Sequence, residues 1–326
     1  MIRQASNNPS ATRVLVTGGT GKTGRELVRL LRDRGMRVRV ASRTVPVVTN
    51  PTTATAETGV RKQIDCGPSR PAFGRIGNPA ADDPETIRFD WNDPDTHLAA
   101  LDGQDRVFLV PPTQSTDPMP SVGPFLAEAR RLGISRVVLL GSAVPLAPTA
   151  PELAAQVRAQ PGWVVLRPSG FMQNFLSPHP LGERIRRDGE IRTAAGDGRV
   201  GWIDTRDIAA TAAAALLSDP DAIPGGDYLL TGPQALSYPE AAAIITAGTG
   251  RPIRVVHTTV DEQAAGLRAA GIPAEFAAIL AAADAGARAG REDELSTAVL
   301  DLTGHAPRTF TQFVREHATR WAAPAA

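Results

Sequence analysis

The chain has 326 residues, 42% of them hydrophobic, and its 35 lysines and arginines against 34 acidic residues give a formal net charge of +1. A chain so close to neutral provides no general basic field, so its composition argues against nucleic-acid binding. Its single cysteine, Cys66, excludes an internal disulfide and a cysteine-based metal site, and the histidines show no ligand spacing. No segment reads as a membrane span or a signal peptide, so we expect a soluble cytoplasmic protein without a metal or a membrane partner.

A glycine-rich loop near the N-terminus is the most informative feature of the sequence. Residues 13–24 read RVLVTGGTGKTG, in which a short apolar run is followed by a glycine turn and then by an amphipathic stretch. A strand, a turn and a helix in this order can hold a pyrophosphate against the free N–H groups of the helix start. We therefore predict a dinucleotide site; a glycine turn without a ligand is the alternative. The predicted cofactor contacts of the loop are Gly18, Gly19, Thr20, Gly21, Lys22, Thr23 and Gly24.

The end of the second predicted strand, residues 37–40, bears on the choice of dinucleotide. A site for NAD normally places an acidic residue there, whereas this chain places Ser42 and Arg43. A hydroxyl and a guanidinium can hold a 2′-phosphate, so the sequence favours NADP. Lys22 also favours NADP, because a cation in the first turn of a helix opposes the helix dipole unless an anion lies nearby. A polar strand exit without this role is the alternative.

Strands and helices continue to alternate as far as residue 166. We predict further strands at residues 87–89, 106–110, 136–140 and 163–166, and helices at residues 94–101, 122–132 and 152–160. This alternation predicts an α/β fold in which right-handed crossovers join the strands of a doubly wound parallel sheet. Ligands of such sheets lie beyond the carboxyl ends of the strands.

The residues that follow the predicted strands are therefore further candidates for cofactor contacts. They are Asp90, Trp91, Pro111, Gly141 and Ser142, with Pro112 expected on the substrate side. Asp90 can accept a hydrogen bond from the adenine amino group, or it can form a turn. The two prolines remove backbone donors and stiffen the wall beside the cofactor. Ser142 can bond a substrate or the nicotinamide amide, or it can be a turn serine.

The remainder of the chain is predicted to be mostly helical. We expect helices at residues 206–217, 261–270, 273–289 and 309–320, a strand at 227–230 that extends the sheet, and a hairpin turn at 196–198. The chain then divides into a dinucleotide-binding core, residues 1–166, and a small substrate-side lobe, residues 167–326. Within the core, residues 44–86 hold six prolines and seven threonines and are interpreted as an insertion, either a tolerated appendage or a cover over the adenosine end.

Segments spread along nearly the whole chain resemble the NmrA-like branch of the atypical short-chain dehydrogenase/reductases. They include VLVTGGTGKTGRELVRLL, FDWNDPDT, LRPSGFMQNFL and WIDTRDIAATAAAAL, and the GGTGKTG and DWND pieces are most similar to ergot-alkaloid-type reductases and their bacterial relatives. The resemblance implies a Rossmann fold that binds NADP, with a C-terminal lobe over the substrate. It implies cofactor-side roles for Gly18, Gly21, Gly24, Arg43, Asp90 and Ser142. It places Phe171, Met172 and Asn174 in the substrate pocket, near the nicotinamide.

The chain departs from the usual catalytic pattern of short-chain dehydrogenases, in which a Lys four residues after a Tyr lowers the phenol pKa. Its two tyrosines, Tyr228 and Tyr238, are followed at that spacing by Gly232 and Ala242. The segment before LRP, PELAAQVRAQPGW, holds no Lys or His that could replace the pair. Carbonyl reduction with a built-in proton donor is therefore not favoured.

An acceptor that is already activated avoids this difficulty. An iminium carbon takes a hydride without a proton, and an enone or quinone can take its proton from water. We predict an NADP-dependent reductase of such a small acceptor, in secondary metabolism. A non-redox cyclisation or isomerisation and an NADP-sensing regulatory protein are the alternatives, and a homo-oligomer stays open.

The sequence does not identify a catalytic residue. The candidates are Ser142, Asn174 and His179. His179 is either an acid facing the pocket or a histidine on a loop surface. Asp204 and Asp207 are expected to be structural, because carboxylates stabilise the helix start at which they lie.

Overall fold

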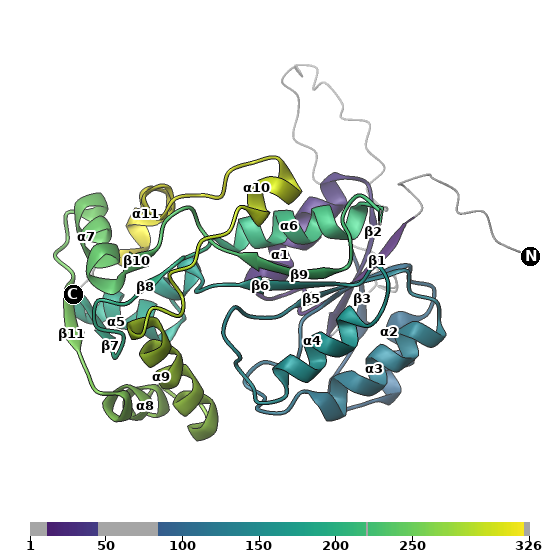
Figure 1. The fold of residues 1–326 in the computed structure, drawn as a ribbon, viewed down its shortest axis with the longest axis horizontal. Coiled ribbons are helices and arrows are strands. Elements are labelled where there is room, and N and C mark those ends of the chain that lie inside the picture. Colours follow the sequence, from purple (N-terminus) through teal and green to yellow (C-terminus); the bar gives the residue numbers. More distant parts are fainter. Residues whose placement is uncertain (1–11, 45–83, 220, 323–326) are drawn as a thin grey trace, which may run out of the picture.

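The computed structural model describes residues 12–44, 84–219 and 221–322. Its centre is a seven-stranded parallel sheet (Figure 1). In spatial order the strands are β3 (Glu85–Arg88), β2 (Arg37–Ser42), β1 (Arg13–Thr17), β4 (Arg106–Leu109), β5 (Arg136–Leu140), β6 (Val164–Pro168) and β9 (Gly226–Leu230). The predicted Rossmann-type sheet is confirmed, including the late strand that extends it. The strand order reverses between β1 and β4, which is where ligands of such sheets bind.

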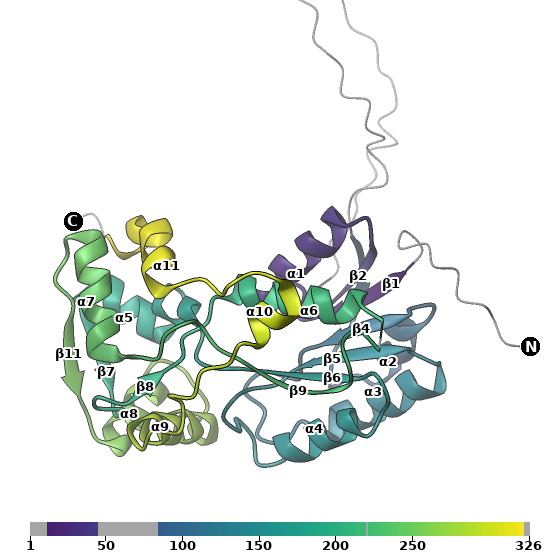
Figure 2. The same cartoon turned by 45° about the horizontal axis from the view of Figure 1, so that its top comes forward.

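Helices cover both faces of this sheet (Figures 1 and 2). One face carries α1 (Lys22–Asp33), α6 (Thr205–Leu217) and α10 (Ala298–Thr303), and the other carries α2 (Asp95–Leu101), α3 (Met119–Arg131) and α4 (Ala150–Arg158). Successive strand residues point to opposite faces. Val14 and Val16 of β1 therefore pack with the α1 and α6 side, whereas Leu15 packs with the other side.

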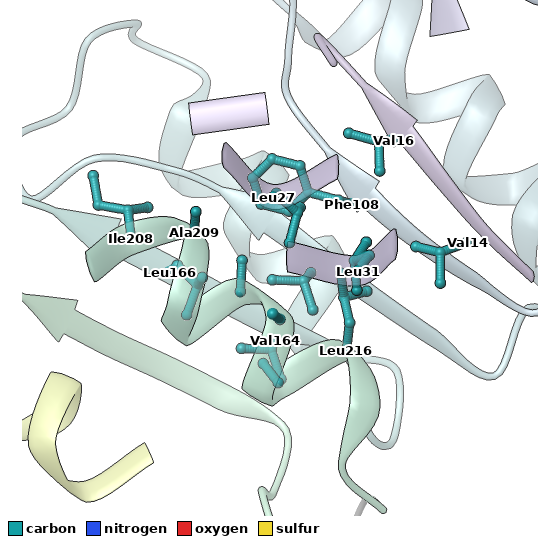
Figure 3. Packing of buried hydrophobic residues seen from close by; sticks show 14 of the residues in the cluster. Val14, Val16, Leu27, Leu31, Phe108, Val164, Leu166, Ile208, Ala209 and Leu216 are labelled. Carbon is teal, nitrogen blue, oxygen red and sulfur yellow. The ribbon is translucent and has the colours of Figure 1, made fainter. Parts of the chain in front are cut away.

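Figure 3 shows the core on the α1 and α6 face, where Leu27 and Leu31 of α1 and Ile208 of α6 meet the strand residues. These three side chains are 0% exposed. Burial of such a side chain contributes about 1.5–3 kcal/mol, so this packing fixes the start of α1 beside the end of β1.

Apart from α6, β9 and α10, which belong to the central sheet and its cover, the chain beyond β6 builds a lobe that is mostly helical, as predicted. Its helices are α5 (Pro180–Asp188), α7 (Tyr238–Thr249), α8 (Val260–Ala269), α9 (Ala274–Arg288) and α11 (Phe310–His317), with short 3-10 turns η2 (Met172–Phe175) and η3 (Ala318–Trp321). A separate core holds it together, in which the ring of Phe175 meets Trp202 edge-on with centroids 4.9 Å apart. None of the helices in the described parts of the chain is long and apolar enough to cross a bilayer.

Four short strands complete the lobe and correct one prediction. The strand β7 (Glu190–Thr193) pairs in parallel with β11 (Arg254–His257), and β8 (Arg199–Val200) pairs with β10 (Leu236–Ser237). Residues 196–198 therefore do not form the predicted hairpin turn, because β7 and β8 pair with other strands. Gly198 is small for a different reason: a Cβ atom there would lie 2.3 Å from the carbonyl oxygen of Ala287, at the end of α9.

Most of the predicted insertion lies outside the described residues, since the structure describes only its two ends. The predictions for residues 45–83, which include Cys66, therefore stay predictions.

Candidate functional site

The glycine-rich loop forms a tight turn between β1 and α1. Gly18 adopts a φ of +65°, a region that favours glycine, and its carbonyl oxygen accepts a hydrogen bond from the N–H of Gly21 at 2.9 Å. A Cβ atom at Gly24 would lie 2.2 Å from that same oxygen, and one at Gly19 would lie 2.7 Å from Val40 Cγ1. The backbone of the loop and the first turn of α1 therefore pack directly on each other, and no side chain fits at Gly19 or Gly24.

The start of α1 gathers hydrogen-bond donors that have no acidic partner. The helix has no side-chain N-cap and no acidic residue in its first turn, so its first N–H groups keep their donor capacity. The Thr23 hydroxyl is buried and has no hydrogen-bond partner among the described residues. Lys22 adds an ammonium group at the same helix start, and burial lowers its pKa. Such a set of donors suits an anion.

The structure joins Lys22 to another predicted site residue, Asn174. The ammonium Nζ of Lys22 donates to Asn174 Oδ1 at 3.0 Å and to the carbonyl oxygen of Gln173 at 3.5 Å. Asn174 lies in the turn η2, after the last residues of β6, and 152 positions separate it from Lys22 in sequence. The phosphate-loop candidate and the pocket candidate therefore belong to one cluster.

Gln173 holds this turn in place, and the sequence analysis does not single it out. Its Nε2 donates to Asp204 Oδ1 at 2.8 Å, and its Oε1 accepts from the N–H of Thr205 at 3.0 Å. Asp204 is the N-cap of α6 and also pairs with Arg206 and Arg308, which agrees with its predicted structural role. Because these bonds fix both ends of the Gln173 amide, the backbone of η2 is anchored to α6.

Asp207, the other carboxylate predicted to be structural, lies in the first turn of α6. One of its oxygens accepts a hydrogen bond from the N–H of Arg308 at 2.8 Å. Burial raises its pKa to about 6. The carboxylate therefore ties α6 to the segment before α11, as a structural residue does.

His179 lies at the start of α5 and caps that helix. Its Nδ1 accepts a hydrogen bond from the N–H of Leu181 at 3.3 Å, so the ring caps α5. Burial, together with the positive charge of Lys22, lowers its pKa to about 4. The histidine is thus a half-buried helix cap. The ring is neutral near pH 7 and its Nδ1 is used by the helix, which does not favour a proton donor, and the acid role stays a prediction.

The ends of β2 and β3 carry the candidates for the adenosine side. Ser42 is half-buried and accepts from the N–H of Thr44 at 3.3 Å, while Arg43 is exposed. Asp90 Oδ1 accepts from the N–H of Asn92 at 3.0 Å, which is a turn-forming bond. Trp91 packs edge-on against Phe125 with ring centroids 5.2 Å apart. The turn role of Asp90 is therefore present, and its contact with adenine, like those of Ser42 and Arg43, stays a prediction.

The end of β4 lies beside the loop, and β5 is the next strand of the sheet. Thr17 ties the end of β1 to β4, because its Oγ1 accepts from the N–H of Val110 at 2.7 Å. The four candidates that follow these strands are half-buried; they are Pro111, Pro112, Gly141 and Ser142. The N–H of Gly141 donates to the carbonyl oxygen of Leu166 at 2.8 Å, so the Gly141 backbone is bonded to β6.

The substrate-pocket candidates in the turn after β6 have different surroundings. Phe171 is half-buried and pairs with Ile203 through an isolated bridge. Met172 is 1% exposed and belongs to the core of the lobe, so its side chain supports the turn from behind. Asn174 is half-buried and bonded to Lys22. Within the described parts of the chain, no group of three or more His, Cys, Asp or Glu side chains could hold a metal ion.

No protein-family model matches the chain. Individual relatives nevertheless cover it almost completely. An uncharacterized oxidoreductase of Bacillus subtilis, YesF, is 36% identical over 94% of this chain and 96% of that protein. The agroclavine dehydrogenase of Claviceps fusiformis is 33% identical to this chain, over 94% of this chain and 98% of the length of the dehydrogenase. The NAD(P)H azoreductase of Xenophilus azovorans is 31% identical over 95% and 99% of the two chains.

Solved structures agree on the architecture. The triphenylmethane reductase of Citrobacter sp., in a crystal structure complexed with NADP(H), matches with a TM-score of 0.71 over 94% of this chain and 99% of that one. The two sequences are 20% identical, so the likeness concerns the fold.

Proposed function

Since the chain belongs to the NmrA-like atypical short-chain dehydrogenase/reductases, we propose that it is an oxidoreductase that uses NADPH to reduce a small activated acceptor. The observation that carries the proposal is the start of α1, where uncapped N–H groups, the buried Thr23 hydroxyl and the Lys22 ammonium gather, and where the first helical turn holds no acidic residue. The names of the relatives, a dehydrogenase of agroclavine and an NAD(P)H azoreductase among them, support a reductase acting on small molecules.

The residues of this chain fit a dinucleotide. The glycines let the loop pack closely on the first turn of α1, whose N–H groups have no side-chain cap and could bind a pyrophosphate, with Lys22 and Thr23 completing its surroundings. Ser42 and Arg43 would hold the 2′-phosphate, and Asp90 and Trp91 would lie beside the adenine. The segments after β4 and β5, with Pro111, Gly141 and Ser142, would flank the nicotinamide. When bound, the cofactor supplies a hydride to the acceptor.

Neither the two tyrosines nor His179, which all lie among the described residues, is set up as a proton donor for this reaction. Tyr228 donates its hydroxyl to the carbonyl oxygen of Pro224 at 2.9 Å, and burial raises the pKa of Tyr238 well above its ordinary value. Neither tyrosine has the Lys at the spacing that would lower its pKa, and His179 is neutral near pH 7. Activated acceptors need no such donor, so we assign an iminium, an enone or a quinone as the substrate class. The substrate would lie against Pro112, Phe171 and Asn174.

We also keep the proposed division of the chain, with the dinucleotide held by residues 1–166 and the acceptor covered by residues 167–326. Two other functions remain candidates for this pocket, a non-redox cyclisation or isomerisation and NADP sensing. A reductase consumes NADPH only when an acceptor is present, which separates it from both.

The experiment is NADPH oxidation by the purified protein against a panel of cyclic iminium salts, enones and quinones. We expect turnover with at least one class and the reduced product in equal amount. NADPH binding without any turnover would instead support the sensing or non-redox functions.

A further inference from the structure

We propose that Asn174 determines which acceptor the site prefers: its amide, oriented by Lys22, donates hydrogen bonds to an oxygen atom of the substrate. The site would then favour neutral conjugated carbonyl compounds, such as quinones and enones, over iminium ions. This inference rests on the proposed reductase function and narrows its substrate class.

Lys22 fixes the orientation of the Asn174 amide. An ammonium group has three donors and no acceptor, so the oxygen of Asn174 must face Lys22. The 3.0 Å contact from Nζ to Oδ1 has this arrangement. Because the amide is planar, its NH₂ group then points away from Lys22. That group has no hydrogen-bond partner among the described residues, so both of its donors are left to offer.

The turn that carries Asn174 is held rigidly by its neighbours. The backbone of η2 is held by Gln173, by the N–H of Met172, which donates to the Ile203 carbonyl at 2.9 Å, and by Trp321, whose Nε1 donates to the Phe175 carbonyl at 2.7 Å. The ring of His179 lies against the backbone of Asn174. A donor fixed in advance costs little reorganisation when charge develops near it, which is what makes such donors effective.

Asn174 lies at the edge of the sheet where the ligands are expected. The turn η2 follows β6 at the carboxyl edge of the sheet, where ligands of this fold lie. Its contact with Lys22 places Asn174 next to the first turn of α1, beside the proposed pyrophosphate site. The amide donors therefore lie where cofactor and acceptor are expected to meet.

The chemistry separates the acceptor classes. When hydride, with its electron pair, adds to the conjugated carbon of an enone or quinone, the π electrons move onto the carbonyl oxygen. The amide N–H groups of Asn174 stabilise the oxyanion, and a proton from water then completes the reduction. Hydride addition to an iminium ion neutralises a positive charge and forms no oxyanion, so it gains nothing from these donors.

The test compares Asn174→Asp with the wild type and with Asn92→Asp, the same chemical change at an exposed asparagine. The Asp variant keeps an oxygen for Lys22 but replaces the NH₂ donors with a second, negatively charged acceptor oxygen, which opposes an oxyanion and does not repel a cationic iminium ion. At saturating NADPH, kcat for quinones and enones should fall about 100- to 1000-fold, the usual effect of losing an oxyanion donor, while kcat for iminium salts changes less than about threefold. An equal loss for all classes would overturn the proposal, because Asn174 would then support the turn alone.

A second readout needs neither cofactor nor turnover. The oxygen of 4-nitrophenolate resembles the oxyanion, and its absorbance reports binding. In the absence of NADPH, its Kd should rise about tenfold in Asn174→Asp and in Lys22→Met, and Lys22→Arg should recover most of the affinity because Arg also presents only donors to Oδ1. Equal Kd values in wild type and Asn174→Asp would refute the proposal even if NADPH-dependent turnover is observed. Absence of turnover with intact phenolate selectivity would refute the proposed function instead.

Discussion

Two side chains at the end of β2, Ser42 and Arg43, decide the cofactor preference in the proposed function. The side chain of Arg43 is exposed at the end of β2, where a guanidinium could bind a 2′-phosphate. An Asp at the same position would repel the phosphate and accept from a ribose 2′-OH.

Arg43→Asp should therefore reverse the preference for NADPH over NADH. Loss of a charge-assisted hydrogen bond costs about 1.5–3 kcal/mol, which is roughly ten- to a hundredfold in affinity. Calorimetric titration of each cofactor measures the change, with Arg34→Asp as a control at another exposed arginine. An unchanged NADPH affinity would remove Arg43 from the site.

At the residue scale, the sequence predicted the loop but not the contacts that complete the site. The glycine spacing is local and could be read directly, whereas the bond from Lys22 to Asn174 spans 152 positions and requires the fold. Gln173 was missed because a polar residue in a short turn reads as exposed. For His179 the available signal was the Pro180 that follows it, since a proline at the first position of a helix marks the preceding residue as its cap.

At the scale of elements, the packing of α1 on the loop is the most sensitive point of the site. Gly24→Ala would place a methyl group 2.2 Å from the Gly18 carbonyl oxygen, so the loop or the helix must shift. We expect a lower melting temperature and at least a tenfold loss of NADPH affinity.

Gly266→Ala provides the matched control, because this glycine lies inside α8 and its Cβ would meet no atom within 4 Å. An alanine there should raise helix stability by up to about 1 kcal/mol and leave NADPH affinity unchanged. Similar behaviour of the two variants would contradict the close packing of the loop.

The strands and helices of the core were predictable because each apolar run ends at a glycine or a polar turn. The helices and strands of the lobe were less predictable from the sequence. The helix α7 was not predicted, since its alanines and isoleucines show no clear polar face, although Ser237 and Glu240 form a capping box at its start. The strands β7 and β8 pair with distant segments, so nothing local marked residues 196–198 as a loop that packs on α9.

At the scale of the whole molecule, an acidic group inside the lobe makes stability depend on pH. Burial and the nearby charge of Asp284 raise the pKa of Glu292 to about 7, from an ordinary value of 4.5. The folded chain therefore binds this proton more tightly than the unfolded chain does. Between these two pKa values the group stabilises the folded state as pH falls, and this contribution is lost as pH rises through about 7.

Glu292→Gln should remove this dependence. The melting temperature of the wild type minus that of the variant should increase as pH falls from 8 to 6. Glu294→Gln, at a neighbouring exposed residue, is the control. Comparing variants at each pH cancels the contributions of other titrating groups, including His179, whose lowered pKa acts in the opposite sense below about pH 6.5. A constant difference across this range would show that Glu292 titrates as an ordinary carboxylate.

If the donors at the start of α1 hold the phosphates of NADPH, loss of the Lys22 ammonium must weaken binding, and calorimetric titration of NADPH into the wild type and Lys22→Met measures this. We predict one NADPH bound per chain, with an affinity ten- to a hundredfold weaker in Lys22→Met, as expected for losing an ammonium-to-phosphate contact of about 1.5–3 kcal/mol. Absence of binding by the wild type, or equal affinity in the two proteins, would show that these donors do not hold the phosphates.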